Sequence, residues 1–180
     1  MNNEVLRKAT GAKDIAIMGL FIAIVYVSTA FILVPGPSEG GLFHMGNVAH
    51  FTIAIVFGRK KGAISGAFGM ALFDILSPYA AWAPFTFIIR FAIGYVIGYI
   101  AHMNGKRGAN LIQNIISMIP ATIIMIGGYY LAEGIMYGNW ISPAASIPGN
   151  ATQCLVGGIS IIIAPILIKT FKARRIEIES

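Results

Sequence analysis

The chain alternates between long apolar stretches and short polar connections, and this pattern predicts helices that cross a membrane. A helix spans the hydrocarbon core with about 20 apolar residues. Six apolar segments approach this length, at about 14–34, 43–57, 62–77, 84–103, 110–136 and 147–171. The second and third segments are short, so we expect them to be packed inside the bundle or to lie where the bilayer thins.

Lysine and arginine gather in alternate connections, and this distribution predicts the orientation of the segments. The connections at 35–42, 78–83 and 137–146 contain neither residue. The positive-inside rule therefore places both termini in the cytoplasm, which agrees with an even number of spans. Every basic residue except Arg90 falls on the cytoplasmic side: Arg7, Lys8, Lys13, Arg59, Lys60, Lys61, Lys106, Arg107, Lys169, Lys172, Arg174 and Arg175.

Composition agrees with a membrane protein that has little mass outside the bilayer. Of 180 residues, 57% are hydrophobic and only 11% are charged, and the mean hydropathy is +0.77. We expect a single all-α domain over 1–180, a multi-pass protein of the cell membrane that contacts lipid. The net charge of +6 follows from membrane topology, so it does not indicate a nucleic-acid partner.

Two charged residues lie inside apolar segments, which makes them candidates for a functional site. Asp74 is one turn from the outer end of the third segment, and Arg90 is two turns from the outer start of the fourth. The short connection between these segments makes them antiparallel neighbours, so the two charges lie at compatible depths. We expect an Asp74–Arg90 ion pair, or both groups facing a wet cavity. A buried pair that only fixes helix register is the structural alternative.

Other polar and aromatic residues occur at the same depth, near the outer ends of the segments. Asn150 follows a Pro-Gly pair and could instead be a helix N-cap, and His50 could make an interhelical hydrogen bond. The aromatic residues of the outer connections form either an interfacial belt or a lid that stacks on a flat ring. The predicted substrate-binding set is Asn47, His50, Asp74, Tyr79, Trp82, Arg90, Tyr129, Glu133, Asn150 and Gln153.

Small residues recur along one face of the first segment, over its cytoplasmic half. Such faces let two membrane helices approach closely. Similar spacings in the third and fourth segments are expected to serve internal packing. The stripe in the first segment could instead dock another membrane subunit, and it consists of Ala12, Ala16, Gly19 and Ala23.

Several common functional motifs are absent from the sequence. It contains no phosphate-binding loop, no metal-ligand cluster and no nucleophile elbow. We therefore expect no cofactor, no metal and no catalytic residue. A membrane-embedded enzyme that uses Asp74, His50 and Glu133 is the alternative from another class, and a small channel is a third. A channel predicts polar residues along whole helices, whereas the polar residues here stop in the outer half.

The central part of the chain resembles a known family. Residues 43–102 read FHMGNVAHFTIAIVFGRKKGAISGAFGMALFDILSPYAAWAPFTFIIRFAIGYVIGYIAH. This block is similar to that of substrate-binding S components of energy-coupling factor (ECF) vitamin transporters, in the group that includes riboflavin and hydroxymethylpyrimidine transporters. Arg90 stands where lysine is usual in that group. The opening of the last segment, PGNATQ, fits the resemblance as well.

The resemblance implies a six-helix membrane protein that captures a vitamin or vitamin precursor from outside. It implies partners as well, namely a transmembrane coupling subunit and two ATPase subunits, with the stripe of the first segment as the docking face. Within the group we expect a small ligand, either hydroxymethylpyrimidine or a form of vitamin B6. Riboflavin or another B vitamin remains the alternative.

Overall fold

The computed structural model describes residues 3–31, 33–35 and 42–175, with side chains for 11–31 and 44–175. Apart from turns and short connections, the described residues form helices and one small antiparallel hairpin of β1 (Leu33–Pro35) and β2 (Leu42–His44). The all-α expectation missed this hairpin, and most of the 35–42 connection lies outside the described residues. The helices are α1 (Asn3–Phe31), α2 (Gly46–Ile75), α3 (Ala83–His102), α4 (Leu111–Tyr137), α5 (Ile147–Gly157) and α6 (Ser160–Ala173).

α2 is a helical hairpin with two arms, 46–57 and 59–75, which meet at Gly58. Gly58 has φ 84° and ψ −177°, a conformation that costs glycine little and other residues much. A Cβ added to Gly62 would lie 2.5 Å from the Ala54 Cβ, and one added to Gly66 would lie 2.0 Å from His50 Nε2. These pairs are symmetric about Gly58, so the arms run antiparallel in close contact. The segments expected at 43–57 and 62–77 are thus the two arms of one element.

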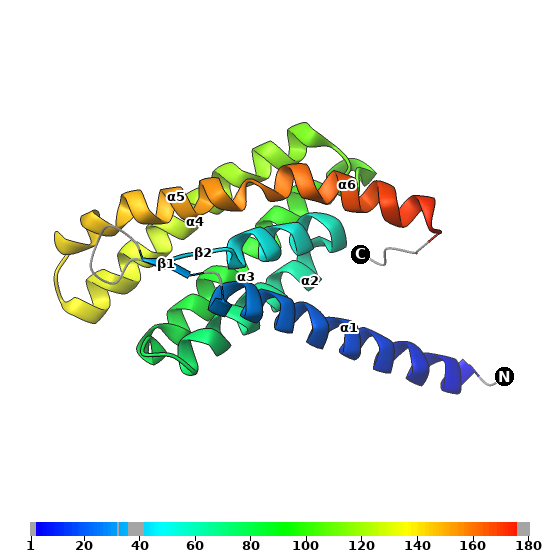
Figure 1. The fold of residues 1–180 in the computed structure, drawn as a ribbon, viewed down its shortest axis with the longest axis horizontal. Coiled ribbons are helices and arrows are strands. Elements are labelled where there is room, and N and C mark those ends of the chain that lie inside the picture. Colours follow the sequence, from blue (N-terminus) through cyan, green and yellow to red (C-terminus); the bar gives the residue numbers. More distant parts are fainter. Residues whose placement is uncertain (1–2, 32, 36–41, 176–180) are drawn as a thin grey trace.

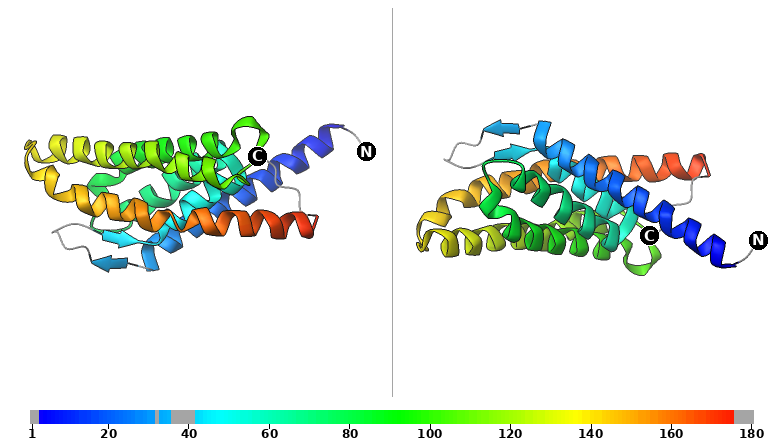
Figure 2. Two further views of the ribbon diagram at one scale, coloured as in Figure 1. Left: turned by 90° about the horizontal axis from the view of Figure 1, so that it is seen from above. Right: turned by 90° about the horizontal axis from the view of Figure 1, so that it is seen from below.

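The α2 hairpin occupies the centre of the molecule. Its two arms are buried along most of their length and contact α1, α3, α5 and α6. The main core joins Phe51 and Ile55 of the first arm to Ile93 and Ile97 of α3 and Met125 of α4. α1 crosses the other side of α2, as Figures 1 and 2 show. Close packing around the hairpin therefore holds the helices that carry the polar residues.

The last two helices differ in one respect from the single segment expected at 147–171. α5 ends at Gly157 and α6 begins at Ser160, so a short break divides the segment. α4 agrees with the expected 110–136 and is capped by Asn110, whose side chain accepts a hydrogen bond of 3.0 Å from the Gln113 amide. Both views of Figure 2 show α4 running beside α5 and α6.

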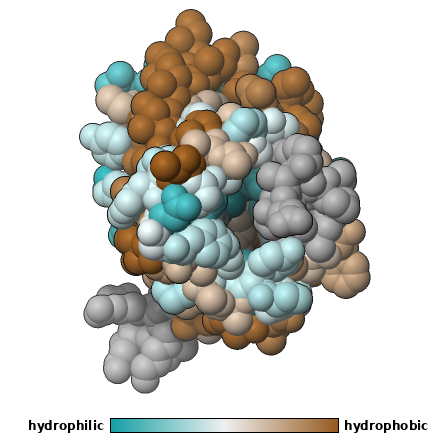
Figure 3. Space-filling model, turned by 90° about the vertical axis from the view of Figure 1, so that its left-hand side faces the viewer, coloured by the Kyte–Doolittle hydropathy of each residue, from teal (hydrophilic) through white to brown (hydrophobic). Residues whose placement is uncertain are grey.

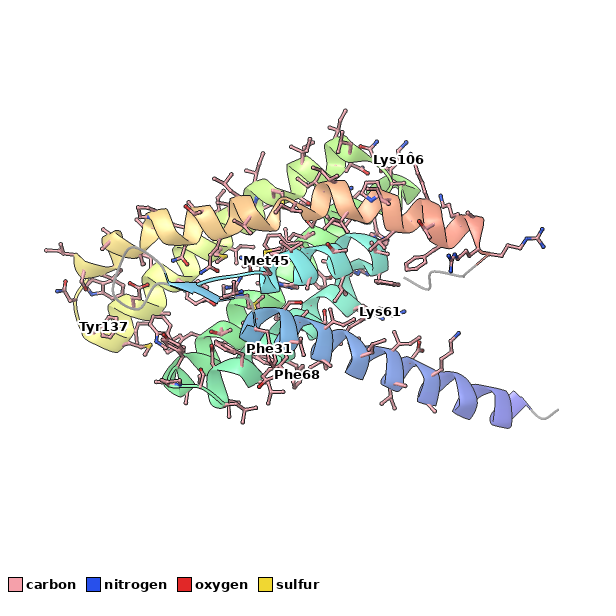
Figure 4. All side chains as sticks on the ribbon, in the orientation of Figure 1. Phe31, Met45, Lys61, Phe68, Lys106 and Tyr137 are labelled. Carbon is pink, nitrogen blue, oxygen red and sulfur yellow. The ribbon has the colours of Figure 1, made fainter. Side chains whose placement is uncertain are left out.

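The two ends of the molecule differ in chemistry. Lys61 and Lys106 lie toward one end and Tyr137 lies at the other, as Figure 4 shows. We call the first the basic end and the second the aromatic end. α1 begins and α6 finishes toward the basic end, while the β-hairpin and the α4–α5 connection lie toward the aromatic end (Figure 1).

The outer surface carries many large apolar side chains. Ile15, Ile88, Ile123 and Leu155 are each at least two-thirds exposed, which is a pattern suited to lipid. Within the described residues, four helical stretches are long and apolar enough to cross a membrane: Gly11–Phe31, Ala80–Gly105, Leu111–Tyr137 and Ser142–Ala173. These features indicate an integral membrane protein.

Candidate functional site

Arg90 lies at the centre of a buried polar network near the middle of the helix bundle. Its side chain is only 2% exposed. Nη1 donates to Asn47 Oδ1 at 2.7 Å and contacts Met125 Sδ at 3.3 Å, while Nε donates to the Tyr129 hydroxyl at 3.2 Å. The guanidinium also lies over the Tyr129 ring, 5.3 Å from its centroid. Residues of α2, α3 and α4 therefore fix one buried cation, as the sequence analysis expected of an inward-pointing arginine.

Asp74 is connected to Arg90 through two hydroxyl groups. The Tyr129 hydroxyl, which accepts from Arg90, lies 3.4 Å from Thr86 Oγ1, and the Thr86 side chain hydrogen bonds to Asp74. Within the described part of the chain, no direct ion pair joins Asp74 to Arg90. The relay lets the carboxylate partly balance the arginine charge from a distance, because each hydroxyl accepts one hydrogen bond and donates another.

Asn47 extends the network to α5. Its Nδ2 donates to the Gln153 carbonyl oxygen at 3.0 Å and approaches Gln153 Oε1 at 3.4 Å. Asn47 is fully buried at the start of the first α2 arm. Since Oδ1 accepts from Arg90 while Nδ2 donates to Gln153, both ends of the amide are used and its orientation is determined. The network thus includes residues from four helices.

Aromatic side chains stand beside this network toward the aromatic end. The Trp82 ring lies 6.1 Å from that of Tyr129 and 6.3 Å from that of Tyr137. Figure 3 views the molecule from the aromatic end and shows a hollow at its centre with hydrophilic surface inside and hydrophobic surface on the outer flanks. A polar hollow with aromatic rings near its mouth suits a small, flat, polar molecule.

Apart from Trp82, which only stands beside the network, four residues of the predicted set lie outside it. His50 is fully buried between the two α2 arms and α3, where its ring packs against Gly66 and Gly94. Tyr79 is half-buried in the connection before α3, and Glu133 is half-buried within hydrogen-bonding reach of Ser146. Asn150 lies in the first turn of α5 and is not its N-cap, which is Ser146.

Two contributors to the network were missed by the sequence analysis. Thr86 and Arg90 are four residues apart on α3, and Met125 and Tyr129 are four residues apart on α4. Residues at this spacing share one helix face. Searching one turn on either side of each intramembrane polar residue would have found both.

The small-residue stripe of α1 faces away from the bundle. Ala12, Ala16, Gly19 and Ala23 are all exposed, and a Cβ added to Gly19 would meet nothing within 4 Å. The small residues of the second α2 arm differ, because Gly62, Ala63, Gly66, Ala67 and Ala71 are buried. Internal packing therefore uses the α2 residues and leaves the α1 stripe uncovered.

The three residues considered for an enzyme do not form a common centre. Asp74 bonds to Thr86, Glu133 lies near Ser146, and His50 packs between the α2 arms. Among the described residues, no group of three or more His, Cys, Asp or Glu side chains could hold a metal ion. The polar residues instead form one network of fixed hydrogen-bond donors and acceptors around Arg90.

Comparison with known proteins gives consistent results. The thiamine precursor transporter HmpT of Lactococcus lactis subsp. cremoris is 25% identical over 172 residues, covering 94% of this chain and 93% of that protein. An uncharacterized protein in the gap 3′ region of Pyrococcus woesei is 28% identical over 114 residues, which are 63% of this chain and 74% of that protein. The crystal structure of FolT bound with folic acid superimposes with a TM-score of 0.68 at 24% identity, covering 88% of this chain and 94% of that chain.

The likeness to FolT shows that the two chains share a fold. The family model described as "ECF-type riboflavin transporter, S component" matches residues 10–173, nearly the whole chain. The match includes the block from 43 to 102 and all residues of the polar network. This chain belongs to the family of ECF-type riboflavin transporter S components.

Proposed function

We propose that this chain captures a small vitamin precursor at the outer side of the cell membrane, with hydroxymethylpyrimidine as the best candidate. The observation that carries the proposal is the buried Arg90 guanidinium, which Asn47 and Tyr129 hold next to the aromatic rings of Tyr129 and Trp82. HmpT, which matches nearly the whole chain, is named a thiamine precursor transporter. Hydroxymethylpyrimidine is such a precursor.

The unused donors of Arg90 suit a nitrogen heterocycle. A guanidinium carries five N–H donors, and the described hydrogen bonds of Arg90 use Nε and Nη1. Nη2 is therefore available to a ring nitrogen or hydroxyl of the ligand. Trp82 supplies a flat surface on which a pyrimidine could stack. A single charged donor beside a small cluster of aromatic rings fits a one-ring ligand better than a large one such as riboflavin.

The proposed topology has six crossings with both termini in the cytoplasm. The two α2 arms would supply the second and third crossings, and α5 with α6 would supply the sixth. The basic end would face the cytoplasm, because it holds Lys61 and Lys106. The aromatic end, with its polar hollow, would then face outward and receive ligand directly.

We also propose that the exposed α1 stripe docks a transmembrane coupling subunit, which in turn works with two ATPase subunits. Ala12, Ala16, Gly19 and Ala23 make a smooth surface that another membrane helix can approach closely. The relatives in this family are transporter S components rather than enzymes, so ligand capture and hand-over are the activity to be tested.

A ligand screen tests the proposal directly. The full chain in mild detergent would be mixed with hydroxymethylpyrimidine, pyridoxine, riboflavin, thiamine or folate, and thermal unfolding would be followed. A tightly bound ligand raises the unfolding temperature by mass action. We expect the largest rise with hydroxymethylpyrimidine and a 1:1 stoichiometry by calorimetry. A rise with riboflavin or a vitamin B6 form alone would change the assigned substrate, and no rise with any compound would reject vitamin capture.

A further inference from the structure

A second concave site lies at the basic end, away from the Arg90 network. It is an open groove of about 410 Å³ between the tip of the α2 hairpin and the end of α3. Its lining includes Gly58, Arg59, Gly98, Tyr99, His102 and Asn104. We call it the inner groove. None of the polar-network residues contributes to its lining, so it is a separate feature of the fold.

The inner groove contains a cation that has no acidic partner among the described residues. The Arg59 guanidinium lies over the rings of Tyr95 and Tyr99, 5.5 and 5.7 Å from their centroids. No carboxylate in the described part of the chain forms an ion pair with it. Cation–π contacts orient a guanidinium without neutralising it. Arg59 therefore presents a positioned positive charge to whatever occupies the groove.

A row of exposed aromatic rings leads away from this charge along α3. Tyr99 stacks on Tyr95 at 6.5 Å between centroids, and Tyr95 stacks on Phe91 at 6.4 Å. The three side chains are 49%, 39% and 41% exposed. Because they are spaced by four residues, the row extends about 12 Å along the helix axis. Its direction is toward the centre of the proposed membrane.

The walls of the groove are held by close backbone packing. A Cβ added to Gly98 would lie 2.4 Å from the backbone nitrogen of Arg59, so only glycine lets the hairpin tip pack against α3 there. On the other side, His102 Nε2 bonds to the Ile55 carbonyl oxygen at 2.8 Å. These contacts join the walls of the groove to the buried core. The shape of the groove therefore depends on backbone packing and not on exposed side chains.

We propose that the inner groove binds one anionic phospholipid of the cytoplasmic leaflet. The headgroup phosphate would contact Arg59, and an acyl chain would lie along Tyr99, Tyr95 and Phe91. Basic pockets at the cytoplasmic ends of membrane helices suit anionic headgroups. The aromatic row can also contact an acyl chain, which a lipid has and a free phosphate lacks, so the site favours a lipid. The inference goes beyond ligand capture and rests on the proposed orientation of the basic end.

Native mass spectrometry of the full chain tests the proposal. The protein in mild detergent would be equilibrated with phosphatidylglycerol or with phosphatidylcholine, and bound lipid would be counted. We expect one preferred phosphatidylglycerol per chain. Arg59→Gln should weaken it about fivefold, whereas Lys60→Gln, a neighbouring exposed change outside the groove, should match the wild type. Equal loss in both variants would show diffuse charge attraction and overturn the site, as would equal binding of the two lipids.

A second pair of variants tests the aromatic row without changing charge. Tyr99→Leu should also lower phosphatidylglycerol binding, and Tyr137→Leu at the aromatic end should not. Displacement of the lipid by inorganic phosphate would indicate a free-phosphate site and overturn the lipid assignment. If these variants left bound lipid unchanged but reduced capture of the coupling subunit, the groove would be a protein contact and the proposal would be wrong.

The same preparations separate this inference from the proposed function. Hydroxymethylpyrimidine binding would be measured by thermal shift on wild type and Arg59→Gln, and we expect equal shifts. Arg59-dependent lipid binding without any vitamin binding would support the groove and reject ligand capture. Vitamin binding together with lipid binding that is unchanged in Arg59→Gln would support ligand capture and reject the groove.

Discussion

Arg90 on α3 donates a hydrogen bond of 2.7 Å to the side-chain oxygen of Asn47, which lies 43 residues earlier on α2. The partner that positions the buried cation is thus a neutral amide, and the nearest carboxylate of the network acts through two hydroxyl groups. A directly paired arginine would have little positive charge left for a ligand. This arrangement orients the guanidinium and leaves most of its charge available to the hollow.

Replacement of Arg90 should weaken ligand binding even when charge is kept. Arg90→Lys retains a cation, but a lysine ammonium lacks the planar fork that reaches Asn47 and Tyr129 together. We expect hydroxymethylpyrimidine affinity to fall about 10- to 100-fold in Arg90→Lys and further in Arg90→Ala, measured by calorimetry. Arg107→Lys, an exposed change at the basic end, is the matched control. Wild-type affinity in Arg90→Ala would remove this residue from the site.

Interruption of the Thr86 relay should destabilise the protein with almost no change in side-chain shape. Thr86→Val removes the hydroxyl that connects Tyr129 to Asp74, and it leaves a buried carboxylate with fewer partners. We expect a loss of about 1–3 kcal/mol, followed as a lower unfolding temperature in detergent. Thr170→Val is the control, because its exposed hydroxyl bonds only to Ile166 of its own helix. Equal effects of the two changes would show that the relay contributes nothing.

The α2 hairpin should not tolerate a methyl group where its arms touch. In Gly66→Ala the new Cβ would lie 2.0 Å from Nε2 of His50, a fully buried ring with no room to move. We expect a cost of about 1–3 kcal/mol. Gly127→Ala is the matched change in a helix, since a Cβ there meets nothing within 4 Å. It should be neutral or stabilising by up to about 1 kcal/mol, and a stable Gly66→Ala would argue against the close approach.

Bulk on the α1 stripe should block assembly and spare ligand capture. Ala16→Trp fills the smooth face, whereas Ile15→Trp enlarges a neighbouring residue that is 76% exposed on another side of the helix. When the coupling and ATPase subunits are co-expressed, we expect Ala16→Trp to lose co-purification and Ile15→Trp to keep it. Both should show wild-type thermal shifts with ligand. Normal assembly of Ala16→Trp would move the docking face elsewhere.

Cysteine labelling in whole cells should report the orientation. The native Cys154 is buried, so a Cys154→Ala background removes it at modest structural risk. In that background an impermeant maleimide should label Asn139→Cys, at the aromatic end, from outside. Lys60→Cys and Lys106→Cys should react only after the membrane is opened. The opposite pattern would invert the topology and place the hollow on the cytoplasmic side.

Much of the site follows from one rule, that polar groups inside a membrane must be satisfied internally. The sequence analysis chose intramembrane charges and the polar and aromatic residues at the same depth, and the structure brings Arg90, Asn47, Tyr129 and Gln153 together. Partner choice was harder, because it depends on how far each helix rotates about its own axis. Those rotations come from close backbone approaches, such as Gly62 against Ala54, which a one-dimensional pattern does not show.

For the helices, the sequence predicted the positions of the apolar segments but not where the backbone turns or breaks within them. Hydrophobic length located most helix ends within a few residues, but α1 begins at Asn3, well before the expected start at about 14. It did not show that Gly58 joins two expected segments into one hairpin, or that Gly157 ends α5 inside a continuous apolar stretch. Both breaks fall at glycines, where the backbone conformation determines whether the helix continues. Hydropathy does not show these breaks because it stays uniform across them.

The Gly58 turn has a consequence for how the protein is made. At 1.5 Å per residue, the arms of α2 measure about 18 and 25 Å, and each is shorter than the hydrocarbon thickness of about 30 Å. In the proposed topology neither arm would span the membrane stably alone, so the nascent chain would have to insert both together, with Arg59 at the tip kept on the cytoplasmic side. In that topology the positive φ of Gly58, which lets the two arms fold against each other, would be a condition for inserting the centre of the protein.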